Sequence, residues 1–582
     1  MDLPPTERAS PALLLRYARR RFAPNRADLV AALLLAGAAV LVARGAGEMN
    51  QPLSALRITP VTLDPAMLPQ YALLTTLRMF AALAASLVFT FLVATLAAKS
   101  RKAELVIIPA LDILQSVPVL GFLTFTVTFF MGLFPGQELG VECAAIFAIF
   151  TAQAWNMAFS FYQSLRSLPS DLEEATELFH LSAWRRFWRL ELPFATPALV
   201  WNTMMSMSGA WFFVVASEAI TVGKTTVALP GIGSWLAMAI EKGDVWAVAW
   251  AVGTMGVVIV IYDQLLFRPI VAWADKFRFE QTASQDRPNS WFYDLLRRTR
   301  LIPRLMQPIA RALDSLPRPP ARRFALPRIR DRRVVRGLDG LWLAVVIGFS
   351  AWGAWLVFRY VSATLTWRDA LNAFGLGALT LIRVLVLIAL ASVIWLPIGV
   401  WIGLRPVWAE RVQPIAQFLA AFPANVLFPV VVVAIVALRG DPNIWLSPLM
   451  ILGTQWYILF NVIAGASALP GDLREAASIF HVRSWQWWRT VALPGVFPYY
   501  VTGALTASGG SWNASIVAEV ASWRHTELQA AGLGAFIANA TAAGDYPRVA
   551  LGIAVMSVFV IAINRILWRP LYAYAERRLR LN

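Results

Sequence analysis

Charged residues are scarce in this chain of 582 residues, where they make up only 15% while 58% of the residues are hydrophobic. Windows of about 20 residues with almost no charge recur along the sequence, and a helix needs this length to cross the hydrocarbon core of a bilayer. Runs of about ten residues with alternating polarity, which are typical of a transmembrane β-barrel, are missing. The composition therefore predicts an all-α polytopic membrane protein.

Histidine and cysteine are also rare, with three and one residues respectively. The single cysteine, Cys143, excludes an internal disulfide, and three scattered histidines do not provide the spaced ligands of a metal site. No Ser-His-Asp arrangement is readable either. We therefore expect neither catalytic residues nor a metal site in this chain.

A complete phosphate-binding loop is missing as well. Gly223-Lys224-Thr225 resembles the end of such a loop, but Glu218 stands where a glycine is required five residues earlier. We therefore expect that the chain does not hydrolyse ATP itself and binds no cofactor of its own.

The net charge of +17 is concentrated in a few segments. Residues 276–336 and both ends of the chain carry a large excess of Lys and Arg over Asp and Glu. Basic residues beside membrane spans mark the cytoplasmic side and meet anionic lipid head groups. No basic fold with interleaved aromatic residues accompanies this charge, so nucleic-acid binding is not expected. The pattern predicts cytoplasmic N- and C-termini.

The apolar runs fall into two similar halves, each with about six predicted spans, or about 12 in all. The third spans are predicted near 107–133 and 412–438, and the fifth near 198–222 and 496–520. An even number of spans gives both halves the same orientation, which predicts a parallel duplication. The predicted domains are a cytoplasmic segment (1–28), a first transmembrane domain (29–269), a basic cytoplasmic linker (270–336), a second transmembrane domain (337–570) and a cytoplasmic tail (571–582).

Matched residues support the duplication. At a constant offset of 301 residues, the two halves share Trp211 and Trp512, Glu218 and Glu519, Gly231-x-Gly233 and Gly532-x-Gly534, Gly243-Asp244 and Gly544-Asp545, and Arg268-Pro269 and Arg569-Pro570. Further upstream, Arg78 aligns with Arg383. Hydrophobic composition alone does not produce such identities, so the sequence predicts two tandem domains of one fold.

Two polar and basic islands interrupt the apolar runs, at Asp171–Pro193 and Asp472–Pro494. Each has a Glu-Ala pair 19 residues before the proline of a Leu-Pro step. The D-x-x-E spacing at the start of each island also fits a helix capping box, which remains open beside any docking role. The island residues singled out are Glu174, Ala175, Thr176, His180 and Pro193, and their counterparts Glu475, Ala476, Ala477, His481 and Pro494.

The islands resemble the EAA loop of ABC-type importer permeases, the cytoplasmic segment that docks onto an ATP-hydrolysing subunit. That family usually has a glycine where this chain has His180 and His481, which puts the geometry of the turn in question. Stretches such as LDILQSVPVLGF and AEVASW are similar to the nitrate, sulfonate and taurine branch of binding-protein-dependent permeases.

This resemblance implies the transmembrane part of an importer for a small solute, expected to be an anion. Its implied partners are two ATP-binding cassette subunits that use ATP and Mg, an extracytoplasmic solute-binding protein, and membrane lipid. The implied location is the bacterial inner membrane. The alternative is a secondary transporter with parallel repeats, which would need buried acids for ion coupling and would have no use for the islands.

Four residues in the fifth spans are pathway or gate candidates: Trp211, Glu218, Trp512 and Glu519. Ionisable residues in spans usually face a bundle interior or a water-filled path, although a carboxylate at the hydrated interface is the plain alternative. Arg78 and Arg383, early in the second spans, are expected to be interfacial anchors.

Overall fold

The computed structural model describes residues 26–49, 61–116, 119–222, 225–277, 290–299, 308, 332–422, 424–469, 471–523 and 526–578. The N-terminal residues, Lys224, most of the basic linker and the last residues of the tail lie outside these ranges. Predictions that concern those parts of the chain stay predictions.

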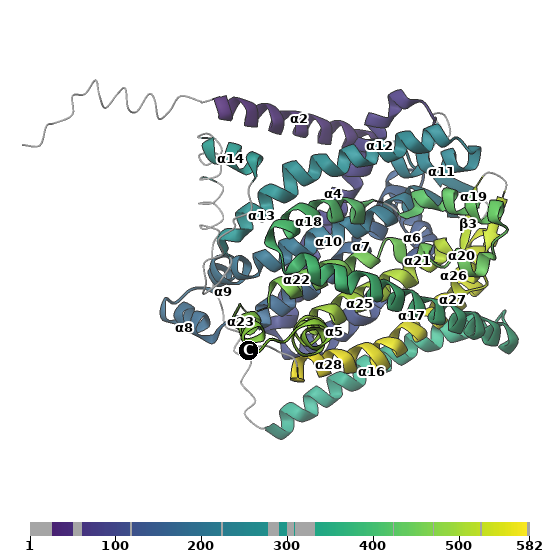
Figure 1. Ribbon diagram of the computed structural model, residues 1–582. Helices are drawn as coiled ribbons and strands as arrows, with labels where there is room; N and C mark the ends of the chain where they lie inside the picture. The colour runs from purple at the N-terminus through teal and green to yellow at the C-terminus, as the bar shows by residue number, and fades with distance from the viewer. Residues whose placement is uncertain are drawn as a thin grey trace, which may run out of the picture. The chain divides into compact units, whose positions relative to one another are not determined.

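The first half is built almost entirely of helices (Figure 1). Its long elements are α2 (Arg26–Glu48), α4 (Leu68–Lys99), α5 (Arg101–Ser116), α6 (Val119–Leu133), α7 (Leu139–Arg166), α10 (Leu192–Glu218), α11 (Ile232–Lys242) and α12 (Val245–Tyr262). The first island forms α8 (Ser170–Leu178), α9 (Ala183–Arg186) and the π-helical turn η2 (Phe187–Glu191). A second π-helical turn, η3 (Asp263–Phe267), leads into α13 (Arg268–Ala274), and α14 (Trp291–Arg298) follows in the linker.

The second half repeats this order of elements. Its main helices are α16 (Arg332–Ser362), α17 (Trp367–Gly403), α18 (Pro406–Ala421), α19 (Phe428–Leu438), α22 (Gln455–Ser467), α25 (Leu493–Ala518) and α27 (Tyr546–Ile563). Shorter elements are α20 (Pro442–Trp445), α21 (Leu449–Leu452), α23 (Gly471–Ile479), α24 (Ser484–Trp487), η6 (Trp488–Ala492), α26 (Leu533–Ala543), η7 (Asn564–Trp568) and α28 (Arg569–Arg578).

One small β-hairpin follows the fifth span of each half. Strand β1 (Ala219–Val222) pairs antiparallel with β2 (Thr225–Ala228), and β3 (Val520–Trp523) pairs with β4 (Thr526–Gln529). The fifth spans were predicted near 198–222 and 496–520, but their helices end earlier, at Glu218 and Ala518. The helices give way to the hairpins at the buried residues Glu218 and Glu519, whose bonds are described below.

Among the described residues, eight helices are long and apolar enough to cross a membrane, and a bent helix pair at residues 442–467 raises this to nine. The chain is a multi-pass membrane protein. The spans expected near 107–133 and 412–438 are each divided into two helices, α5 with α6 and α18 with α19. Proline inside a span removes a backbone donor, and such positions are where spanning helices bend.

The chain divides into two compact units that differ from the two sequence halves. One unit contains Met1–Ala46, Leu168–Val200 and Ile261–Gly337, and the other contains Gly47–Ser167, Trp201–Val260 and Leu338–Asn582. The second unit includes most spans of both halves. Within it, α5 and α6 from the first half contact α27, and α6 also contacts α25 and α26.

Small residues allow close helix packing inside the second unit, where α22 lies against both α17 and α25 (Figure 1). Gly399 and Gly403 of α17 face α22 at Val462 and Ile463. A Cβ atom on Gly403 would lie 2.6 Å from the carbonyl oxygen of Ile463. Such close backbone approach is the common basis of helix association within membranes.

We predict that Gly403→Ala lowers the thermal unfolding midpoint of the detergent-purified protein, because overpacking against backbone costs about 1–3 kcal/mol. Gly375→Ala on the same helix is the matched control, since a Cβ atom added at that position would meet no other atom within 4 Å. It should leave the midpoint unchanged or raise it, because alanine exceeds glycine in helix propensity by about 1 kcal/mol. Equal shifts for the two variants would contradict this packing.

Candidate functional site

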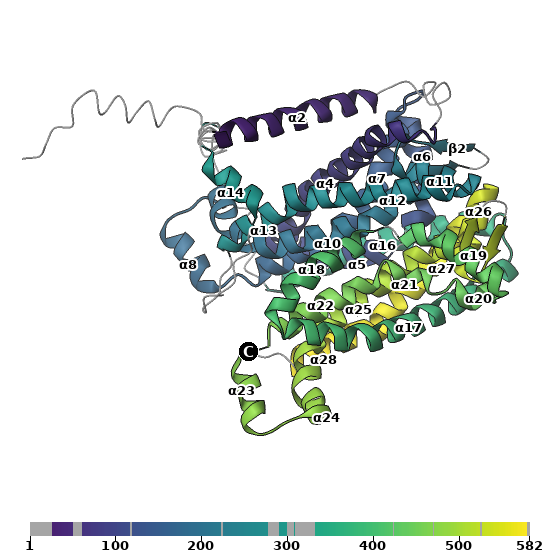
Figure 2. The ribbon, with the colours of Figure 1, turned by 45° about the horizontal axis from the view of Figure 1, so that its top comes forward.

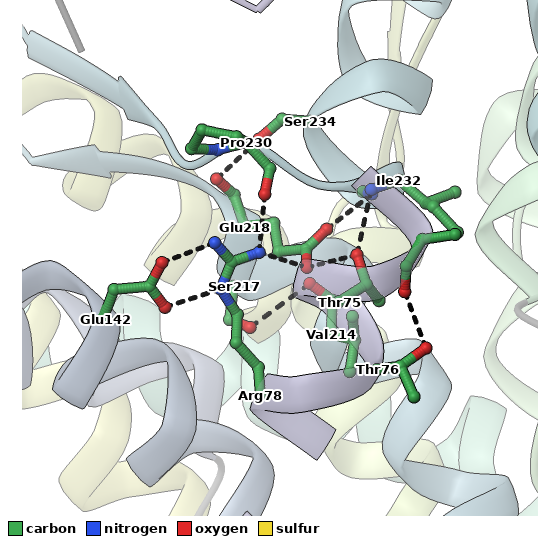
Figure 3. A network of polar contacts seen from close by, with 12 residues as sticks. Thr75, Thr76, Arg78, Glu142, Val214, Ser217, Glu218, Pro230, Ile232 and Ser234 are labelled. Carbon is green, nitrogen blue, oxygen red and sulfur yellow. Dashed lines mark hydrogen bonds and ion pairs between the residues drawn. The ribbon is translucent and has the colours of Figure 1, made fainter. Parts of the chain in front are cut away.

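Glu218, the last residue of α10, is buried and surrounded by hydrogen-bond donors (Figure 3). Its Oε1 atom accepts from the Thr75 hydroxyl and from Nη1 of Arg78, each at 2.7 Å. Its Oε2 atom accepts from the backbone N–H of Gly233 at 2.6 Å. Thr75 and Arg78 lie three residues apart, on one face of α4. One carboxylate therefore ties the end of α10 to α4 and to the beginning of α11.

Arg78 is the cation of this arrangement and is completely buried. Its guanidinium forms a two-point pair with Glu142 of α7, with N–O distances of 2.6 and 2.5 Å, and also donates to the carbonyl of Pro230 at 2.9 Å (Figure 3). The expectation that Arg78 is an interfacial anchor is therefore wrong. A buried guanidinium needs counter-charge, and Glu142 and Glu218 provide it. We call Thr75, Arg78, Glu142 and Glu218 the first cluster.

The second half builds a matching group, here called the second cluster: Thr380, Arg383, Asn443 and Glu519. Glu519 accepts from the Thr380 hydroxyl at 2.8 Å, from Nη1 of Arg383 at 3.1 Å and from the backbone N–H of Ala535 at 3.0 Å. Its side chain is 2% exposed and that of Arg383 is 13% exposed. Arg383 is thus also a partner of the buried carboxylate rather than an anchor at the interface.

The two clusters differ at one position, where Glu142 of the first half corresponds to Asn443 at the offset of 301 residues. Oδ1 of Asn443 accepts from Nη2 of Arg383 at 3.4 Å and from the backbone N–H of Ala531 at 2.8 Å. The first cluster therefore holds one cation and two carboxylates, whereas the second holds one of each.

The Gly-x-Gly element of each half makes room for the buried carboxylate. The backbone of Gly231 is extended, with φ −178°, so its conformation does not require glycine. A Cβ atom on Gly231 would instead overlap the Glu218 carboxylate, and one on Gly532 would overlap that of Glu519. Each carboxylate also lies at the N-terminus of a helix, α11 or α26, where the helix dipole stabilises negative charge.

Both tryptophans predicted to line the pathway are buried. Trp211 and Trp512 are fully enclosed, and the ring of Trp512 stacks on Phe559 with centroids 6.2 Å apart. The structure thus places the four pathway candidates inside the helix packing and brings two of them, Glu218 and Glu519, into the clusters. Their role in transport stays a prediction.

Each island folds into two short helices joined by a tight turn, as Figure 2 shows for α23 and α24. His180 and His481 lie at these turns in the left-handed conformation, with φ 49° and 51°. The N–H of Leu181 bonds to the carbonyl of Thr176 at 3.0 Å, which closes the end of α8 in the manner usual for a C-terminal glycine. Histidine therefore makes the turn that the family usually makes with glycine.

The outer edge of each island is apolar and exposed. Leu178 and Phe179 are 80% and 78% exposed, and Ile479 and Phe480 are 73% and 78% exposed. Exposed apolar patches of this kind mark interaction sites. The remaining predicted island residues surround this edge: Glu174 and Glu475 are exposed, Ala175 and Ala476 half-buried, Thr176 and Ala477 buried, and Pro193 and Pro494 lie in the first turns of α10 and α25.

The islands differ in how they are held together. In the first island, Arg186 pairs with Glu173 and also with Glu191, at 3.0 Å from the latter. The matching residues of the second island are Trp487, Arg474 and Ala492, which do not reproduce these pairs. Trp487 instead packs edge-on against Trp488, with centroids 5.7 Å apart.

The capping boxes that the D-x-x-E spacing left open are not formed. The residue that caps the N-terminus of α8 is Pro169, without a side-chain bond, and Asp171 lies in the first helical turn. Helix α23 begins at Gly471, so Asp472 also lies inside its helix. Asp171 and Asp472 therefore lie in the first turns of their helices, where the helix dipole stabilises negative charge.

Two segments of the chain, residues 86–269 and 395–581, match the family described as binding-protein-dependent transport system inner membrane component. Together they cover more than half of the chain. The chain belongs to this family. Because the match occurs once in each half, both the resemblance to these permeases and the internal duplication are confirmed.

Curated relatives cover shorter segments. The nitrate import permease protein of Leptolyngbya laminosa is 26% identical over 187 residues, 32% of this chain and 63% of the relative. The bicarbonate transport system permease protein of Synechococcus elongatus is 28% identical over 132 residues, 23% of this chain and 46% of the relative. The glycine betaine/carnitine transport permease protein of Listeria monocytogenes is 28% identical over 185 residues, 31% of this chain and 58% of the relative. The chain thus spans less than two thirds of each of these relatives.

Sequence reasoning missed Thr75, Thr380, Glu142 and Asn443 as members of the clusters. A signal for the threonines was present, because Thr75 and Thr380 each stand three residues before the arginine that the repeat aligns. Glu142 and Asn443 are different residue types, so the repeat gave no identity to notice. Only their contacts with Arg78 and Arg383 reveal that they correspond.

We predict that Arg78→Gln destabilises the fold by about 3–5 kcal/mol, because it leaves two buried carboxylates without counter-charge. Arg383→Gln should cost less, since its cluster has one carboxylate. Denaturation midpoints of the purified variants measure the difference, with Arg548→Gln as a control at a pair whose arginine side chain is 47% exposed. Equal losses for Arg78→Gln and Arg383→Gln would show that the clusters are energetically equivalent.

We also predict that His180→Gly preserves the island turn. It should also remove the cost of the left-handed backbone conformation, which is roughly 1–2 kcal/mol for a residue other than glycine. His180→Ala removes the same imidazole but keeps that cost. Limited proteolysis of the first island should be slower for the glycine variant than for the alanine variant. Faster cleavage of the glycine variant would refute the left-handed turn.

Proposed function

We propose that this chain is the complete transmembrane core of an ATP-binding cassette importer. Each half presents one island to one ATPase subunit, and an extracytoplasmic binding protein delivers the solute to the opposite side. Closure of the ATPase pair moves the islands and changes the side to which the pathway opens. The islands and both termini are then cytoplasmic, in agreement with the basic residues that flank the spans.

The observation that carries this proposal is the exposed apolar edge on each island. Phe179 and Phe480 are each 78% exposed, although polar and basic residues surround them. Aromatic side chains are frequent anchors at protein interfaces, where they contribute more than their share of the binding energy. Two copies at matching positions fit two copies of one partner.

A small anion is the proposed solute class. Two of the relatives carry nitrate or bicarbonate in their names, while those named for glycine betaine are a zwitterionic alternative. ATP and Mg would act in the partner subunits. We expect no role for either within this chain, whose sequence lacks a complete phosphate-binding loop.

The buried acids do not favour a secondary transporter. Glu142 and Glu218 share Arg78, and Glu519 is bonded by Arg383 and Thr380. Ion-coupling acids must exchange protons or cations with water during transport. Carboxylates that are held by fixed guanidinium and hydroxyl donors are better suited to fastening helices together.

We predict that Phe179→Ser and Phe480→Ser each weaken binding of the ATPase subunit at least about tenfold, because an interface anchor typically contributes about 2 kcal/mol or more. Co-purification yield and ATP-driven uptake into proteoliposomes measure the effect. Leu438→Ser, at an exposed residue on α19, is the control and should bind normally. Normal binding by both phenylalanine variants would show that the islands are not the docking sites.

A further inference from the structure

A cavity of about 380 Å³ lies within the second unit, where helices of the two halves meet. Corresponding positions of the duplication line it. Ser160 of α7 matches Asn461 of α22 at the offset of 301 residues. Met205 of α10 matches Thr506 of α25 in the same way, and Met205 also packs against apolar residues of α17, α18 and α22. The cavity therefore lies at the contact between the halves.

A second contact between the halves lies one helical turn away from this wall. Gly209 follows Met205 by four residues on α10. Tyr457 precedes Asn461 by four residues on α22. Residues four apart lie on one face of a helix, about 6 Å apart along its axis. A Cβ atom on Gly209 would lie 2.4 Å from the hydroxyl oxygen of Tyr457, so the tyrosine fills the space that the glycine leaves.

This contact lies on the side of the cavity that is remote from the second island. Helix α22 leads directly into that island, so Tyr457 is farther from the island along the helix than Asn461 is. Helix α10 ends at Glu218, so Gly209 is nearer to the first cluster than Met205 is. The contact between Gly209 and Tyr457 therefore separates the cavity from the end of the helices that holds the clusters.

The two sides of the contact differ in how closely they are packed. On the cluster side, Trp211 lies two residues beyond Gly209, and both Trp211 and Trp512 are fully enclosed. On the cavity side, Gln163 and Thr502 of the wall are exposed. The cavity is thus open to solvent at one end and closed at the other.

One half alone provides the large side chain at this contact. The residue of the first half that matches Tyr457 is Asn156, which lines the cavity and donates to the Ser206 hydroxyl at 3.4 Å. Within the part of the chain that the structure describes, the Tyr457 hydroxyl has no hydrogen-bond partner. Packing therefore holds the contact, and α10 and α22 can separate there without breaking a hydrogen bond.

We propose that Tyr457 is a gate residue of the solute pathway, whose packing against Gly209 closes the outer end of the cavity. The inference rests on the proposed importer function and adds the contact that must open for the solute to enter from outside. Movement of one repeat against the other is how transporters built from repeats expose a site to each side in turn. Tyr457 lies where the two repeats touch.

The test asks whether a thiol on the cavity wall can be reached from outside the cell. Thr506→Cys is introduced together with Cys143→Ser, which removes the only native cysteine, and the whole complex is expressed. A membrane-impermeant maleimide is added to spheroplasts or to inside-out vesicles. We expect the thiol to be labelled in the vesicles and protected in the spheroplasts.

Two variants remove the closure by different means. Tyr457→Ala deletes the ring, and Gly209→Ala displaces the hydroxyl. The labelling rate follows the fraction of molecules in which the thiol is accessible, so each variant should raise it in spheroplasts at least about tenfold. Tyr457→Phe, which keeps the ring, should stay protected.

The controls isolate the contact itself. Gly209→Ala combined with Tyr457→Phe should restore protection, because the ring atom Cζ is 3.7 Å from the added Cβ, an ordinary contact distance. Gly509→Ala on α25 should have no effect, since its Cβ would meet no other atom within 4 Å.

The outcomes separate this inference from the proposed function. Labelling in spheroplasts that appears in Tyr457→Ala and Gly209→Ala and is lost again in the double variant supports the gate. Protection in spheroplasts for every variant, with labelling in vesicles, overturns the gate and leaves the importer function intact. Thr506→Cys that is labelled in both preparations, or in neither, also overturns the gate. Labelling in spheroplasts alone would place the islands outside, so both the gate and the proposed function would fall. Should Tyr457→Ala not assemble, Gly209→Ala and its rescue decide.

Discussion

The burial of one carboxylate at the end of each fifth span determines much of the surrounding structure. Glu218 and Glu519 lie away from water, and a buried charge is tolerated only when donors and counter-charge surround it. Three features meet this need: the threonine and arginine three residues apart on the second span, the Gly-x-Gly element, and the N-terminus of the next helix. The hairpin that follows is held in place because its two ends flank the bonded carboxylate.

The same helices connect these carboxylates to the islands. In the second half, α25 begins directly after the π-helical turn η6 of the island and ends beside Glu519. Its 26 residues span about 39 Å at 1.5 Å per residue. A continuous helix between the proposed docking surface and the cluster is a means to transmit motion. The π-helical turn is a place where such a helix bends, and such turns are frequent at functional sites.

The sequence predicted the repeated fold because hydrophobic runs, basic flanks and identities such as Trp211 with Trp512 are local or direct signals. It failed where residues that are distant in the sequence meet in the fold. Arg78 resembles an interfacial anchor until Glu142, 64 residues away, is seen to pair with it. The spacing also left a capping box open, and only the structure excludes it, because α8 begins at Ser170, after Pro169, so the D-x-x-E residues fall inside the helix. A cavity of about 380 Å³ was beyond prediction, since its wall combines residues from distant spans of both halves, such as Ser160 and Asn461.

The two halves differ in charge at three matched positions: Glu142 against Asn443, Arg186 against Trp487, and Asp263 against Asn564. One chain with two unequal halves would replace two separate permease subunits. Native mass spectrometry of the purified complex tests this directly. The account predicts one copy of this chain with two ATPase subunits. Two copies of the chain for each pair of ATPase subunits would contradict it.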